Sequence, residues 1–121
     1  MPHCIIEHSS NLILPENTSE FISNLHNKII DRGNFNIENI KTRIYSSSIF
    51  SVGSENTDKG FVAVTLKILS GRSIDFKENL SEDLLDFFVA EFSKFNKNKK
   101  FNVTVDISEI DKETYARIDV G

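Results

Sequence analysis

The sequence predicts an α+β fold in which two tandem strand-helix-strand units form two layers, a four-stranded mixed sheet with two helices on one face. Three observations lead to this prediction. Stretches of alternating apolar residues flank two segments with apolar residues at helical spacing, the order strand, helix, strand occurs twice, and 121 residues have room for one domain, residues 1–121. Because a helix joins parallel strands by a right-handed crossover, both helices are expected on the same side of the sheet.

The first unit is expected over about residues 2–50. Residues 2–8 predict a strand, and Asn17, with Glu20 in the turn that follows, marks the start of a helix. Five apolar residues of this helix share one face: Phe21, Ile22, Leu25, Ile29 and Ile30. Gly33 is expected to end the helix. Residues 40–45 then alternate as a second strand, with Lys41, Arg43 and Tyr45 on the face opposite to Ile40, Thr42 and Ile44.

The second unit is expected over about residues 61–109, after a polar loop at 51–60. Residues 61–69 predict a strand, Gly71 and Arg72 lie in a turn, and Ser73 is the expected N-cap of a second helix. The apolar residues of this helix are Phe76, Leu80, Leu84, Phe87, Phe88, Phe92 and Phe95. Residues 101–107 alternate as the closing strand. The period is lost from Ser108, and the tail at 110–121 is expected to reach a neighbouring subunit or to cap the sheet edge.

Both faces of the predicted sheet carry apolar side chains, although two helices can cover only one of them. Cys4 and Ile6 alternate with Ile5, and Val62 and Val64 alternate with Phe61 and Ala63. Strands with this pattern are typical of a sheet that is buried on both faces. We therefore expect further copies of the chain to cover the second face.

Composition and charge argue against several classes of partner. The net charge is −4, whereas binding to nucleic acid or to an anionic membrane needs a clustered basic face. Cys4 is the one cysteine, so an internal disulfide is excluded and a reducing compartment fits. No apolar run reaches the length of a membrane span or a signal peptide. We expect a cytoplasmic protein that binds neither nucleic acid nor membrane.

Pro2 is the first candidate for chemistry, because it stands at the start of the first predicted strand. Removal of Met1, which a small neighbouring residue permits, would leave Pro2 as a free secondary amine. A chain terminus titrates near about pH 7.7–8.0, and burial or neighbouring cations lower that pKa. Such an amine is a neutral base at cell pH. The alternative is that proline at this position affects Met1 removal and nothing else.

Arg43 and Arg72 are the candidates for binding an anion. Arg43 lies on a strand face, and Arg72 lies in the turn that enters the second helix, whose N-terminus adds partial positive charge. Arginine suits a bidentate grip on a carboxylate, and an amine base beside two arginines suggests an anionic substrate. Taken alone, an arginine is more often a surface or ion-pair residue.

Other chemistries have weaker support. His3, His8 and His26 show no metal-ligand spacing with Cys4, so no metal site is predicted and a structural role is expected for each histidine. Cys4 is expected to be a small buried apolar residue. Glu7 shares a strand face with His3 and is either a second acid or base or the partner of a basic residue. No glycine-rich phosphate loop is present.

With these residues in view, the chain resembles the tautomerase superfamily, and most closely its two-unit members, the 5-carboxymethyl-2-hydroxymuconate delta-isomerase family. The resemblance covers nearly the whole chain. It rests on Pro2-His3 with Glu7 after it, on the strand around Lys41-Thr42-Arg43, and on Thr65-Leu66-Lys67-Ile68 followed by Gly71-Arg72-Ser73.

The resemblance implies a homotrimer and an isomerase that works without metal or cofactor on a small anionic 2-hydroxy or 2-oxo acid. It assigns Pro2 as general base, with Arg43 and Arg72 as catalytic and substrate-binding groups and Lys41 as a further binding residue. Lys41 departs from the arginine that the family pattern leads one to expect. Two alternatives stay open: another reaction of the superfamily, such as phenylpyruvate-type tautomerisation, hydration or decarboxylation, and a non-catalytic oligomer of the same fold.

Overall fold

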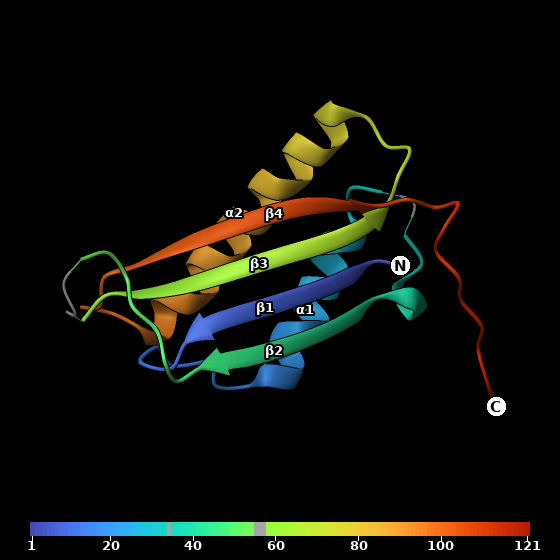
Figure 1. Cartoon of the computed structure of the whole chain (residues 1–121). Helices are drawn as coiled ribbons and strands as arrows, with labels where there is room; N and C mark the ends of the chain where they lie inside the picture. Colours follow the sequence, from blue (N-terminus) through green and yellow to red (C-terminus); the bar gives the residue numbers. More distant parts are fainter. Residues whose placement is uncertain (34, 55–57) are drawn as a thin grey trace.

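The computed structural model describes residues 1–33, 35–54 and 58–121. In chain order its elements are β1 (His3–Ser9), α1 (Thr18–Ile30), the 3-10 helix η1 (Ile37–Asn39), β2 (Lys41–Ser47), β3 (Gly60–Leu69), α2 (Ile74–Phe95) and β4 (Phe101–Ile110). Both helices lie on one side of the sheet, behind it in Figure 1. The predicted two-layer α+β architecture is confirmed.

The four strands form one mixed sheet in the order β2-β1-β3-β4. β1 pairs with β2 and β3 pairs with β4 in parallel, while β1 and β3 pair antiparallel at the centre. Each strand-helix-strand unit thus supplies a parallel pair, and the two units meet head to tail. As a result, the beginnings of β1 and β2 lie at the same end of the sheet as the carboxyl end of β3 (Figure 1).

The two helix starts confirm the predicted caps. The side chain of Asn17 accepts a hydrogen bond from the Glu20 N–H at 3.0 Å, and Ser73 Oγ accepts one from the Phe76 N–H at 3.1 Å. The end of α1 differs from the prediction, because the helix stops at Ile30, three residues before Gly33. Gly33 instead lies against the Phe76 ring: a Cβ there would lie 2.7 Å from Cζ of Phe76, so a larger residue would require the ring to move.

The core lies between the sheet and the helices. Alternate residues of β1 and β3, namely Cys4, Ile6, Val62, Val64, Leu66 and Ile68, are at most 1% exposed and face the helices. Leu25 and Ile29 of α1 and Leu80, Leu84, Phe88 and Phe92 of α2 complete the core. Phe21 stacks on Phe87 and packs edge-on against Phe88 and Phe92, which ties α1 to α2.

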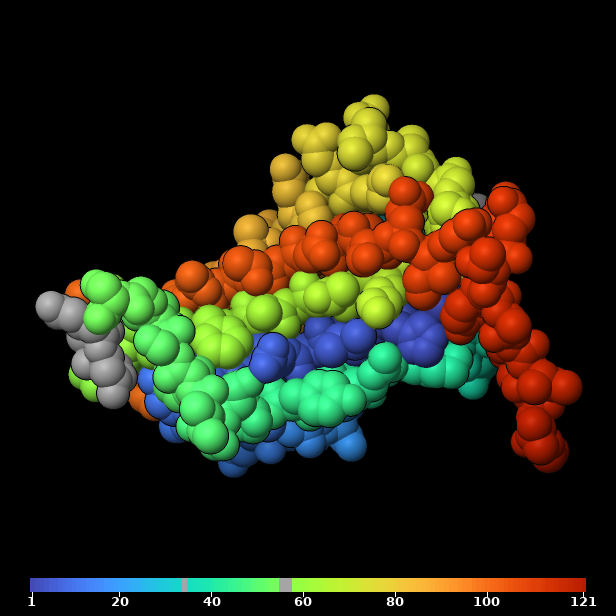
Figure 2. Space-filling model, viewed as in Figure 1, coloured from blue at the N-terminus to red at the C-terminus, as the bar shows by residue number. Residues whose placement is uncertain are grey.

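The opposite face of the sheet has no helix over it. Figure 2 shows the strands side by side on this open face. The register places Ile5 of β1 beside Thr65 of β3, and Phe61 lies on the same face. These side chains are half-buried, while Tyr45 of β2 is 55% exposed. The open face is thus the second, partly apolar face that the alternation predicts.

β4 is longer than the predicted 101–107. Its ladder continues through Ser108, Glu109 and Ile110, which pair with Lys67, Ile68 and Leu69. Backbone pairing with β3 extends β4 beyond the point where the alternation of apolar side chains ends. Glu109 also forms an ion pair of 3.2 Å with Lys77 of α2. The remaining tail turns across the end of the sheet where β1 begins (Figure 1). No helix in the described ranges is long and apolar enough to cross a bilayer.

Candidate active site

The candidate site lies at the end of the sheet where β1 and β2 begin and β3 ends. Pro2 is buried immediately before β1, and its carbonyl accepts a hydrogen bond from the backbone N–H of Lys41 at 3.1 Å. In register, His3 pairs with Lys41 on one side and with Lys67 on the other. Paired residues point to the same face, so two lysines flank His3 on the open face of the sheet.

Arg43 belongs to the same group. Its Nη1 lies 2.9 Å from Nδ1 of His3, and Nε2 of the same ring lies 3.1 Å from the hydroxyl oxygen of Tyr115. The Tyr115 ring also packs edge-on against His3, with centroids 6.3 Å apart. β1, β2 and the tail thus contribute one residue each to a continuous polar chain beside Pro2.

The electrostatics of this end of the sheet favour neutral bases and bound anions. Burial lowers the pKa of His3, and the nearby charges of Arg43, Lys41, the chain's amino terminus and Lys67 lower it further. Burial also lowers the pKa of the amino group of Met1, with Lys41 and Arg117 as further causes. Burial and neighbouring cations are the two effects that lower the pKa of an amine at the chain terminus.

Arg72 reaches this end of the sheet from the turn after β3, but its surroundings differ from those of Arg43. The guanidinium carbon lies 4.2 Å above the centroid of the Phe35 ring and 5.3 Å from that of Phe76. Among the described residues, no hydrogen bond or ion pair joins Arg72 to the other members of the site. The structure therefore brings Pro2, Lys41 and Arg43 together and holds Arg72 against aromatic rings.

Sequence reasoning missed three members of this group and assigned a fourth only a structural role. Lys67, Tyr115 and Arg117 were not among the predicted site residues, and His3 was expected to be structural. The antiparallel pairing of β1 with β3 would have identified Lys67. Tyr115 and Arg117 lie in the tail, where the sequence has no period, and the Arg117 guanidinium donates to the side-chain oxygen of Asn39 at 3.1 Å.

The other singled-out residues lie apart from this group. Cys4 is fully buried beneath the helices, and burial raises the pKa of its thiol to about 12. His8 faces the helices and its Nδ1 donates to the Ser9 carbonyl at 2.8 Å, while His26 bonds with Thr42 at 2.7 Å. Glu7 accepts a hydrogen bond from Ser47 at the far end of β1. No cluster that would hold a metal ion occurs in the part of the chain that the structure describes.

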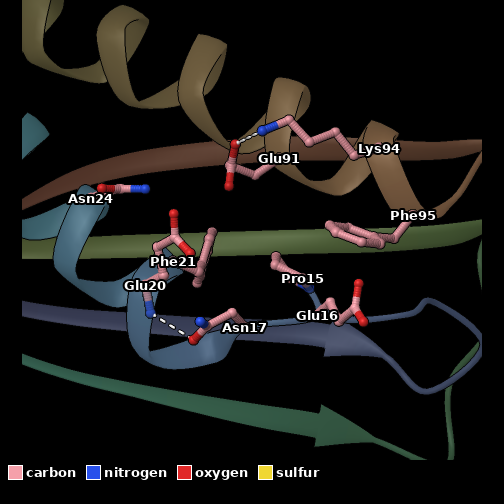
Figure 3. A pocket seen from close by; sticks show the side chains of 9 residues that line it. All are labelled: Pro15, Glu16, Asn17, Glu20, Phe21, Asn24, Glu91, Lys94 and Phe95. Atoms are coloured by element: carbon pink, nitrogen blue, oxygen red, sulfur yellow. Dashed lines mark hydrogen bonds and ion pairs between the residues drawn. The ribbon is translucent and has the colours of Figure 1, made fainter.

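A cavity of about 480 Å³ lies elsewhere, between the start of α1 and the end of α2 (Figure 3). α1 starts after the carboxyl end of β1, so this cavity is at the end of the sheet opposite to Pro2. Glu16, Glu20 and Glu91 line it, and Glu91 already pairs with Lys94 at 2.6 Å. Its acidic lining is unsuited to a carboxylate substrate, so we place the candidate site at Pro2 despite the size of this cavity.

Comparison with known proteins agrees with the fold. A family model described as 5-carboxymethyl-2-hydroxymuconate isomerase matches residues 2–119. The Escherichia coli 5-carboxymethyl-2-hydroxymuconate Delta-isomerase is 23% identical over 110 residues, which are 91% of this chain and 87% of the relative. Both descriptions are those of isomerases.

Solved structures show the same fold. A 5-carboxymethyl-2-hydroxymuconate isomerase from Deinococcus radiodurans R1 has a TM-score of 0.85 at 23% identity, covering 98% of this chain and 90% of that one. A fused 4-OT symmetric trimer has a TM-score of 0.69 at 13% identity, covering 91% and 86%. The tautomerase-like fold is thus confirmed. Because the family model matches nearly the whole chain, this protein belongs to the 5-carboxymethyl-2-hydroxymuconate isomerase family.

Proposed function

We propose that this chain is a cofactor-independent isomerase that moves a proton within an unsaturated 2-hydroxymuconate-type dicarboxylate, with the amine of Pro2 as general base. The observation that carries the proposal is the surroundings of Pro2. The residue is buried, and Lys41, Arg43 and Arg117 are gathered at the same end of the sheet. The family supplies the substrate class, and the cations suit its carboxylates.

Pro2 acts as the base once Met1 has been removed. The surroundings that lower the pKa of the Met1 amino group would act on the Pro2 amine in the same direction, which increases the fraction of the amine that is neutral and able to accept a proton. It takes the proton from one end of the conjugated system and returns it to a carbon, which converts the enol into an unsaturated 2-oxo acid.

The cations bind the substrate and stabilise charge on its 2-oxygen. Arg43 lies on the open face next to the start of β1, and Lys41 is its neighbour on the same strand face. Each donor aimed at a developing oxyanion contributes roughly 3–4 kcal/mol in comparable sites. The ammonium group of Lys41 is a compact charge and lacks the planar pair of donors that a guanidinium has, so it is suited to a single carboxylate oxygen.

Arg72 fits the same role in spite of its aromatic contacts. Stacking uses the flat face of a guanidinium and leaves the N–H groups around its edge free for a carboxylate. The rings of Phe35 and Phe76 thus hold a cation ready at the turn that enters α2. We propose Arg72 as the second carboxylate-binding arginine.

The test is a substrate panel on protein whose intact mass shows that Met1 is absent. Ketonisation is followed by ultraviolet absorbance for 2-hydroxymuconate-type dicarboxylates and for the enol of phenylpyruvate, an aryl monocarboxylate. The proposal predicts a higher kcat/KM for the dicarboxylates. A preference for the aryl enol would reassign the chain to phenylpyruvate-type tautomerisation, and no turnover of any enol would favour a non-catalytic oligomer.

A further inference from the structure

We propose that His3 is a positioning residue: Tyr115 of the C-terminal tail holds it in its Nε2–H tautomer, and its Nδ1 atom then fixes the guanidinium of Arg43. The proposal rests on the proposed function in one respect, that Arg43 binds a substrate carboxylate. It adds two residues, one of them from the tail, to a site that was predicted from Pro2 and the cations.

The direction of each hydrogen bond follows from the donors. A guanidinium has donors and no acceptor, so Nδ1 of His3, 2.9 Å from Arg43 Nη1, must present its lone pair. The ring proton therefore sits on Nε2, which donates to the Tyr115 hydroxyl oxygen at 3.1 Å. A neutral imidazole of the other tautomer would place two donors face to face at Arg43.

The sheet explains why this contact orients Arg43. His3 is in register with Lys41, and Arg43 is in register with Ile5, so His3 and Arg43 are diagonal neighbours on the open face. A free arginine side chain samples many rotamers, and binding a carboxylate would have to order it. A guanidinium already held by the imidazole loses less freedom when substrate binds.

The charges around His3 keep it an acceptor. Arg43 and Lys41 on β2, Lys67 on β3 and the chain's amino terminus all oppose a positive charge on the ring, while Tyr115 in the tail is a neutral partner. Burial acts in the same direction and is the largest cause of the lowered pKa of His3. Protonation at low pH would replace the Nδ1 lone pair with a donor and release Arg43.

The tail is anchored on both sides of Tyr115. Before it, the Lys112 N–H donates to Ser70 Oγ at 3.3 Å, and the Thr114 N–H donates to the Asp111 carbonyl at 3.1 Å. After it, Arg117 reaches Asn39 beside the start of β2. These contacts place the Tyr115 hydroxyl over His3, so the tail is part of the site.

The first test needs no substrate. Nitrogen-15 NMR of the histidine rings reports which ring nitrogen carries the proton, and the proposal predicts neutral His3 with the proton on Nε2 at pH 7. Tyr115→Phe should shift His3 toward a mixture of tautomers, while Tyr45→Phe, which changes the other tyrosine, should leave its ring signals unchanged. A proton on Nδ1, or a protonated ring at pH 7, would overturn the proposal whether or not the protein turns over any substrate.

The second test compares two replacements of His3. Asparagine places its amide oxygen near the position of Nδ1 and keeps an acceptor for Arg43, whereas glutamine reaches the position of Nε2 and leaves Arg43 without one. We expect the KM of His3→Gln to be about tenfold above that of His3→Asn, the scale of one charge-assisted hydrogen bond, with kcat less affected.

If the wild type turns over no substrate, the proposed function fails, and the same comparison is made by calorimetry with cis,cis-muconate, a dicarboxylate without the hydroxyl group. The Kd should then differ between the two variants as the KM would. Equal KM values, or equal Kd values for muconate, would refute the positioning role of His3 even with the predicted tautomer in place.

Discussion

At the scale of single residues, Arg72 has both a structural contact and a proposed role in binding. Its guanidinium rests on Phe35 and Phe76, at 4.2 Å and 5.3 Å from the ring centroids. Such a contact at a partly exposed site contributes about 0.5–1 kcal/mol to stability. A carboxylate contact made in the transition state is several times stronger, so the two roles are separable by the size of the effect on each measurement.

We predict that Arg72→Ala lowers kcat/KM. The loss should correspond to about 2–4 kcal/mol of transition-state stabilisation, the scale of a lost oxyanion donor or charge-assisted contact. The free energy of unfolding should fall by the smaller amount of the lost ring contacts. Steady-state kinetics and urea denaturation measure the two. Arg32→Ala is the matched control, because Arg32, just after α1, pairs with Asp83 of α2 and its loss should leave the kinetics unchanged. Normal kinetics with lowered stability would show that Arg72 is structural alone.

At the scale of elements, α2 packs on the sheet through one of its faces. Phe88 and Phe92 are fully buried between α2 and the sheet, whereas Val89, the next residue along, is 43% exposed. Neighbouring positions on one helix thus differ greatly in buried area. This contrast gives a direct check of the layer arrangement.

Phe88→Ala is predicted to destabilise the protein by about 3–5 kcal/mol, because the fully buried ring is lost and a cavity is left in the core. Val89→Ala, on the outer face of the same turn, should change the free energy of unfolding by less than about 0.5 kcal/mol. Urea unfolding of both variants measures the difference. Equal effects would contradict the assignment of the buried face of α2.

Elements with a clear period were predictable from the sequence, and so were the site residues that these elements carry. Lys41 and Arg43 alternate with Thr42 and Ile44 along β2, so their shared face follows from the spacing alone. The end of β4 was not predictable, because backbone pairing with β3 continues after the apolar alternation stops. Tyr115 was missed for a related reason. It is positioned by hydrogen bonds of the tail residues on either side of it, and the tail sequence has no repeating pattern that would predict them.

At the scale of the whole molecule, the open face of the sheet needs a partner. Helices cover one face only, and the other carries half-buried Ile5 and Phe61 and the exposed ring of Tyr45. Apolar groups gathered on one surface are typical of an interface. A solved neighbour of the same fold is described as a symmetric trimer.

We predict a closed homotrimer of 13.8 kDa chains at micromolar concentration. Light scattering coupled to size exclusion measures the mass of the species in solution, and dilution tests its stability. A stable and active monomer would contradict the expectation that further copies of the chain cover the open face.

The central claim is that Pro2 is the base, and titration of its nitrogen tests this claim most directly. The chain has two prolines, Pro2 and Pro15, so protein labelled with nitrogen-15 proline gives one signal from the candidate amine and one from an amide that cannot titrate. The account predicts that the Pro2 signal titrates with a pKa below the ordinary range of about 7.7–8.0, and that activity rises with pH through the same value. A Pro2 signal that does not titrate in active protein, or a pKa that differs from that of the activity, would contradict it.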